Sequence, residues 1–156
     1  VEYGRDGKVY ATECVELFLA PDGLGLKRVQ IILTPTKEGR WDGRIGYLDD
    51  PLHPLALSGA PDVSWNPRYR YAYRLDPAKK EWSIEAEIPF SELGADVPSE
   101  GARWRGNFAR ERHLSTWDKK KYYGKSEYFL WSPNLQRVAF GDPSAFGDLF
   151  FGNAPE

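Results

Sequence analysis

Two pairs of acidic residues lie where carboxylate chemistry could occur. Glu13 and Glu16 open an apolar segment, and Glu85 and Glu87 stand two positions apart in an alternating one. Glycoside hydrolases use paired carboxyl groups as acid and base or as acid and nucleophile. Acids two positions apart on a strand, however, point to one solvent-facing side, as an ordinary outer face requires. We therefore expect a noncatalytic protein whose first acidic strand is either a sheet edge or a binding site.

Other side chains suited to catalysis or metal binding lack a supporting pattern. Cys14 is the single cysteine, which excludes an internal disulfide and a thiolate-built zinc site, and neither His53 nor His113 has a nucleophile context. No glycine-rich phosphate loop follows a predicted strand. No cofactor is assigned, although calcium stays an alternative because some loop residues offer oxygen ligands. These are Asp49, Asp50 and Asp62.

Arg110 is a stronger candidate for a binding residue. It shares strand parity with Trp104 and Phe108, which we expect to face inward. Because a buried guanidinium is costly to desolvate, Arg110 should meet a carboxylate or a polar ligand in a concave site. The structural alternative is an ion pair, for which Glu16 is one partner to consider.

Aromatic residues are abundant, and most should fill the core of a β-sandwich. Some of them fall in or beside two long predicted loops, 49–67 and 114–126. Rings in such loops could stack on the apolar faces of sugars, or they could form a protein-binding surface. The loop aromatics are Trp65, Trp117, Tyr122, Tyr123 and Trp131.

The elements that position these residues are predicted to be strands. Alternating or continuous apolar segments recur between glycines and prolines, and no segment keeps a helical period for three turns. In one of them Trp82, Ile84, Ala86 and Ile88 should face the core, and the segment 91–94 looks like a single helical turn that Ser91 caps and a glycine ends. The pattern predicts an all-β fold, an antiparallel sandwich with strands near 14–20, 27–34, 40–47, 69–75, 81–88, 103–112, 127–131 and 148–151.

Composition indicates one domain over residues 1–156. The chain is 41% hydrophobic, which suits a single globular core, and its net charge of −2 argues against general nucleic-acid binding. No segment is long and apolar enough to span a membrane, and none reads as a signal peptide. Since the sequence has no methionine, we expect it to be a processed or excised piece of a larger protein.

Four segments resemble the family-nine carbohydrate-binding modules and their DOMON-like relatives. Glu13–Phe18 is similar to the acidic strand D-x-V-E-V-F, and Trp82–Leu93 to W-x-x-E-x-x-I-P-F-x-x-L. Gly106–Arg110 resembles G-x-N-F-x-R, and Phe140–Leu149 resembles the terminal W-x-D-P-S-x-F-G-x-L. The resemblance implies an immunoglobulin-like β-sandwich that binds carbohydrate. It also implies additional N-terminal strands, which this sequence lacks.

The resemblance implies a sugar-binding site whose residues can be carried over by position. Family members hold a terminal sugar between two tryptophans, and these positions correspond to Tyr10 and Phe140. The binding glutamate corresponds to Glu16, a polar strand residue corresponds to Arg110, and we add Trp131 as a further stacking residue. The family's arginine near 30–32 has no counterpart here, which puts recognition of cellulose or xylan ends in doubt.

The segment 103–125 suggests an acidic ligand, because it carries eight basic residues against two acidic ones. A uronate or sulfated glycan would fit such charge; a solvated lysine-rich loop is the alternative, and single-stranded nucleic acid is a weaker one. We expect a monomeric glycan-binding module within an extracellular or periplasmic multidomain protein. The alternatives are a structural accessory domain without glycan binding and, less favoured, a haem-binding redox domain using His53 and His113.

Overall fold

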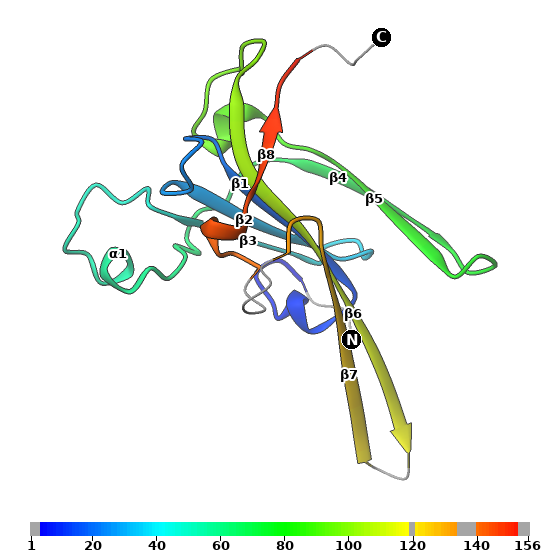
Figure 1. Cartoon of the computed structure of the whole chain (residues 1–156). Helices are drawn as coiled ribbons and strands as arrows, with labels where there is room; N and C mark the ends of the chain where they lie inside the picture. The colour runs from blue at the N-terminus through cyan, green and yellow to red at the C-terminus, as the bar shows by residue number, and fades with distance from the viewer. Residues whose placement is uncertain (1–3, 119–120, 134–139, 153–156) are drawn as a thin grey trace.

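The structure is a computed structural model that describes residues 4–118, 121–133 and 140–152, with side chains left out for 114–124. It is all-β and almost without helix (Figure 1). The strands are β1 (Cys14–Ala20), β2 (Arg28–Leu33), β3 (Arg40–Ile45), β4 (Arg70–Asp76), β5 (Glu81–Glu87), β6 (Arg103–Asp118), β7 (Lys121–Leu130) and β8 (Gly147–Phe150). The short helical elements are η1 (Val9–Ala11), α1 (Pro54–Ser58), η2 (Phe90–Leu93) and η3 (Pro143–Ala145).

All strand pairs are antiparallel. Strands β3, β2, β1, β6 and β7 follow one another across the larger sheet, and β8 also pairs with β6. Strands β4 and β5 form a separate two-stranded sheet that lies over one face of the larger one. In Figure 1 both the β4–β5 hairpin and the far half of the β6–β7 hairpin extend away from the body of the domain.

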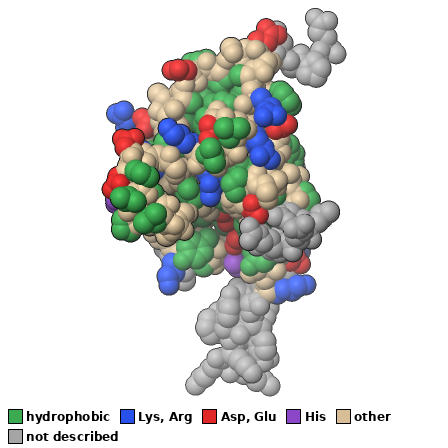
Figure 2. All heavy atoms as spheres, turned by 60° about the vertical axis from the view of Figure 1, so that its left-hand side comes forward, with side chains coloured by type: hydrophobic (Ala, Val, Ile, Leu, Met, Phe, Trp, Pro, Cys, Tyr) green, Lys and Arg blue, Asp and Glu red, His purple; other side chains and the backbone are tan. Residues whose placement is uncertain are grey.

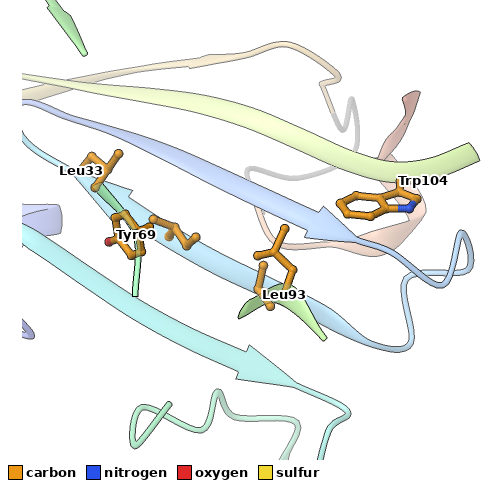
Figure 3. Close-up of a cluster of buried hydrophobic side chains, with 6 residues drawn as sticks. Leu33, Tyr69, Leu93 and Trp104 are labelled. Carbon is orange, nitrogen blue, oxygen red and sulfur yellow. The ribbon is translucent and has the colours of Figure 1, made fainter. Parts of the chain in front are cut away.

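The alternation of β1 divides the large sheet into two faces. Val15, Leu17 and Leu19 point to the inner face, where they pack against the main hydrophobic cluster beneath β4, β5 and η2. Figure 3 shows this cluster, with Leu33, Tyr69, Leu93 and Trp104 labelled. The other residues of β1 point to the outer face and are buried, whereas the three inner-face residues are partly buried. The outer-face residues are Cys14, Glu16, Phe18 and Ala20.

The predicted strands are all present, but the long loops differ from expectation. Residues 114–118 and 121–126 belong to strands and not to a loop, because β6 and β7 stay paired from Ala109 opposite Leu130 out to Asp118 opposite Lys121. Cross-strand pairing therefore overrides the lysine and glycine content that indicated a loop. The aromatic residues Trp117, Tyr122 and Tyr123 lie in these strands, and their side chains are outside the described part of the chain.

The structure differs in part from three smaller predictions. The loop 49–67 contains the helix α1, which His53 caps by accepting a hydrogen bond from the backbone of Leu55. The predicted helical turn is η2, ended by Gly94 in a left-handed conformation as expected, but its N-cap is Pro89 and Ser91 makes no cap bond. In β5 the predicted alternation holds except at Ala86, which is exposed.

Candidate functional site

The outer face of the large sheet carries a cleft of about 670 Å³. Its base is the sheet, where Glu16, Gln30 and Ile32 come from neighbouring strands in the same alternation. Two non-strand segments border it: the N-terminal segment through η1, and the segment beginning at Phe140 that leads to η3, both of which can be followed in Figure 1. The cleft therefore lies between segments from opposite ends of the described chain.

Aromatic rings line this cleft. Tyr10 is 46% exposed and Tyr128 is 47% exposed, and both face the cleft together with Trp41 and Phe140. The rings of Tyr128 and Phe140 are tilted against each other with centroids 5.4 Å apart. The sequence-predicted residues Tyr10, Glu16 and Phe140 are thus brought together.

The floor of the cleft is acidic. Glu16 is 4% exposed, and Gln30 donates a hydrogen bond of 2.8 Å from Nε2 to its Oε2. Burial raises the pKa of the Glu16 carboxyl to about 8, and the nearby carboxyl of Glu111 raises it as well, against the lowering effect of Gln30. Near neutral pH, Glu16 therefore holds a proton.

The rest of the floor is arranged around Glu111. His113 Nε2 lies 3.1 Å from Glu111 Oε2 and 3.1 Å from the carbonyl oxygen of Tyr10. Since both partners are acceptors, Nε2 carries the hydrogen and donates to them, while Nδ1 faces the Ser126 hydroxyl at 3.1 Å. His113 thus ties the N-terminal segment to β6 and orients Glu111.

Cys14 completes a group of possible metal ligands. One ligand atom each of Cys14, Glu16 and Glu111 lie within 4.8 Å of one another, the one such group in the part of the chain that the structure describes. Burial, followed by the charges of Glu16 and Glu111, raises the pKa of the Cys14 thiol well above its ordinary value. The thiol is therefore protonated and is a poor metal ligand in this state.

Arg110 and Trp131 belong to the opposite face of the sheet. In the pairing of β1 with β6, Arg110 lies opposite Val15 and Glu16 lies opposite Ala109, so Arg110 and Glu16 point to different sides. Arg110 is also not buried. Its Nη2 lies 3.3 Å from Glu13 Oε2, and its guanidinium stacks over Trp82 at 5.1 Å. The expected ion pair of Arg110 is thus made with Glu13, and an Arg110–Glu16 pair was wrong.

A second, more apolar groove of about 720 Å³ opens beside Arg110. Trp131 is 52% exposed there and packs edge-on against Phe108, with ring centroids 5.6 Å apart. Phe129 also lines this groove and is 53% exposed. Trp131 and Arg110 therefore border a surface that the sheet separates from the cleft holding Tyr10, Glu16 and Phe140.

The basic side chains of the segment 103–125 that the structure describes lie in ion pairs with nearby acids. Arg103 and Arg105 lie 3.7 and 3.8 Å from Asp148, and Arg112 and Lys125 lie 3.4 and 3.8 Å from Glu127. Figure 2 shows one face of the molecule, on which acidic and basic side chains are interspersed with hydrophobic ones. The formal excess of charge therefore does not form one unpaired basic surface among the described side chains.

The remaining sequence candidates are engaged elsewhere. Glu87 is exposed and bridges to Arg70, as an outer-face residue would. Asp62 bonds Arg44 and Ser64, and Asp50 accepts a hydrogen bond from the backbone of Leu52. No cluster of metal-ligating side chains forms around these acids or Asp49 in the described ranges.

Sequence reasoning missed several residues of the cleft, namely Gln30, Trp41, Glu111 and Tyr128. Strand parity held the signal for Glu111, because a residue next to Arg110 must point to the opposite face. Gln30, Trp41 and Tyr128 could not be assigned to the cleft without knowing how the strands pair with one another. Gln30 stands in the region where the resemblance implied an arginine.

Comparison of the chain with protein-family models, curated proteins and solved structures found no significant match to any of them. The described helices include none with the length and apolar character needed to cross a membrane. The fold and the geometry of the cleft are therefore the basis for assigning a function.

Proposed function

We propose that this chain is a noncatalytic carbohydrate-binding module that holds a terminal sugar in the outer-face cleft. The observation that carries the proposal is the placement of Tyr10 and Phe140 in a cleft whose floor presents Glu16 and Gln30. Rings of this kind stack on the apolar faces of a pyranose, and the amide and carboxyl groups hydrogen-bond its hydroxyls. The resemblance to family-nine modules supports the same positions.

The arrangement of the acids favours binding over catalysis. A retaining glycoside hydrolase keeps its two carboxyl groups about 5–5.5 Å apart with the scissile bond between them. Glu16 and Glu111 instead contact each other on one floor, with Glu16 almost fully buried. Two groups that share a proton on the same side of a ligand cannot serve as separate acid and nucleophile.

By the same resemblance, we place the module in a larger extracellular or periplasmic protein, where it binds polysaccharide for an attached activity. The alternative of a structural accessory domain is retained as the outcome of a binding experiment. No observation on the described residues favours a haem-binding domain, since His53 caps α1 and His113 is bonded within the cleft floor.

The experiment is titration calorimetry with a panel of short neutral and charged oligosaccharides. Tyr10→Ala and Phe140→Ala should each weaken binding about tenfold or more, which corresponds to about 1.4 kcal/mol for a lost stacking face. Trp131→Ala is the matched control, because it removes a ring of similar exposure from the other groove. Circular dichroism and urea unfolding establish that each variant is folded.

Two results would contradict the proposal. The first is a folded wild-type protein that binds no oligosaccharide of the panel, which would favour the structural accessory domain. The second is binding that is lost in Trp131→Ala but kept in Tyr10→Ala and Phe140→Ala. This result would place the sugar in the apolar groove beside Arg110 and Trp131.

A further inference from the structure

The floor of the cleft carries acidic side chains. Glu16 and Glu111 both line the cleft, and no lysine or arginine lines it among the residues that the structure describes. The arginines on the adjoining strand are engaged with other acids: Arg105 with Asp148, Arg110 with Glu13, and Arg112 with Glu127. A ligand carboxylate or sulfate would therefore find two acids and no described lysine or arginine at the floor, where His113 is already hydrogen-bonded to Glu111.

Glu16 is a buried carboxyl group without a positive partner. Its hydrogen-bond partners are the neutral amide of Gln30 and the carboxyl group of Glu111, so its closest charged neighbour is another acid. A buried charge is stable in a protein only when it is paired and hydrogen-bonded. In the free protein a proton serves this purpose, and a ligand cation with hydrogen-bond donors would serve it equally well.

The walls of the cleft suit a cation with an apolar body. Tyr10, Trp41 and Tyr128 present aromatic rings, whose faces attract ammonium groups by up to about 2 kcal/mol when water is excluded. The same rings stack on the C–H faces of a sugar. A sugar that carries an ammonium group fits both features, with its ring against the walls and its charge on the floor.

We infer that the cleft selects glycans that end in a protonated amino sugar, with the ammonium group placed between the carboxyl groups of Glu16 and Glu111. This inference rests on the proposed function and specifies its ligand class. It replaces the acidic glycan expected from the basic segment, because the basic residues of that segment that are described are paired outside the cleft.

The test compares four probes by calorimetry at pH 6.5, in 150 mM salt with EDTA. They are short oligomers of glucosamine, of N-acetylglucosamine, of glucose and of galacturonic acid. The glucosamine oligomer should bind at least tenfold more tightly than the other three. Physiological salt screens nonspecific attraction to the surface, and EDTA removes divalent cations that would compete for the carboxyl groups.

Glu111→Gln tests the role of the acidic floor. It keeps an acceptor for His113 while removing one charge, so the preference for glucosamine over the glucose oligomer should fall about tenfold. Glu87→Gln is the matched control, because it removes the same charge from an exposed position on β5 and should leave the preference unchanged.

The outcomes separate this inference from the proposed function. Equal or tighter binding of the glucose, acetylated or uronate oligomer would overturn the inference and leave the glycan-binding proposal intact. A preference for glucosamine that survives in Glu111→Gln would also overturn it. Failure of every oligomer to bind would overturn both.

Discussion

The raised pKa of Glu16 predicts an unusual pH dependence of folding stability. The carboxyl titrates near pH 8 in the folded protein against about 4.5 ordinarily. Between these values the folded state holds a proton that the unfolded state has lost, so the free energy of unfolding falls as pH rises. Within that window the free energy of unfolding falls by about 1.4 kcal/mol for each pH unit. From pH 4.5 to 7 the loss amounts to roughly 3 kcal/mol.

The perturbation that isolates this effect is Glu16→Gln. The amide of glutamine mimics the protonated carboxyl, because its oxygen accepts from Gln30 while its NH₂ group can donate to Glu111. We expect the two proteins to have similar stability near pH 4.5. Near pH 7 the variant should be more stable by roughly 3 kcal/mol, because it has no carboxyl to ionise.

The assay is urea unfolding followed by tryptophan fluorescence at intervals from pH 4.5 to pH 8.5. Glu87→Gln again serves as the control. Because Glu87 is exposed, the free energy of unfolding of this variant should depend on pH as that of the wild type does. Other shifted groups, such as Asp42, titrate equally in both proteins and cancel in the difference. Parallel profiles for the wild type and Glu16→Gln would refute the argument that Glu16 is a buried acid lacking a countercharge.

Two further predictions concern the backbone and the thiol. Gly46 has φ +82° and an added Cβ would run into the carbonyl of Leu26, whereas Gly59 has φ +67° with open space around it. Gly46→Ala should therefore lower the free energy of unfolding by clearly more than the roughly 1 kcal/mol expected for Gly59→Ala, and equal urea midpoints would contradict this. Cys14 is fully buried with a raised thiol pKa, so a thiol reagent should label it only when the protein unfolds. Rapid labelling under native conditions would show that the floor opens without unfolding.

The strands were predictable from the sequence because local pattern determines them. Alternation in β5 and the apolar content of β1 and β2 identify their positions, and β1 was predicted with its observed limits. The hairpin of β6 and β7 was cut short because lysines and a glycine are typical of loops. Its extension depends on pairing between two strands, which no single segment reveals.

The candidate site was only partly predictable for the same reason. Tyr10, Glu16 and Phe140 were chosen by position, and the structure places them in one cleft. Arg110 was assigned to the same site from the family resemblance and from its parity within its own strand, without the pairing between strands. Its face follows from the register of β1 against β6, which sets Arg110 opposite Val15. A shift of one residue in this register would exchange the faces.

The central position of β6 makes the cleft a late product of folding. The Glu13–Arg110 ion pair joins residues 97 positions apart, and the His113 contact with Tyr10 spans 103 positions. Closing so long a stretch of chain carries an entropic cost, and contacts of this kind form slowly, whereas β6 and β7 pair residues that are close together in the sequence. During synthesis the floor cannot assemble until β6 has left the ribosome, and the buried acid on β1 remains solvated until then. Docking of β1 onto β6 is thus the step at which this chain both joins the two parts of its large sheet and forms the floor of the outer-face cleft.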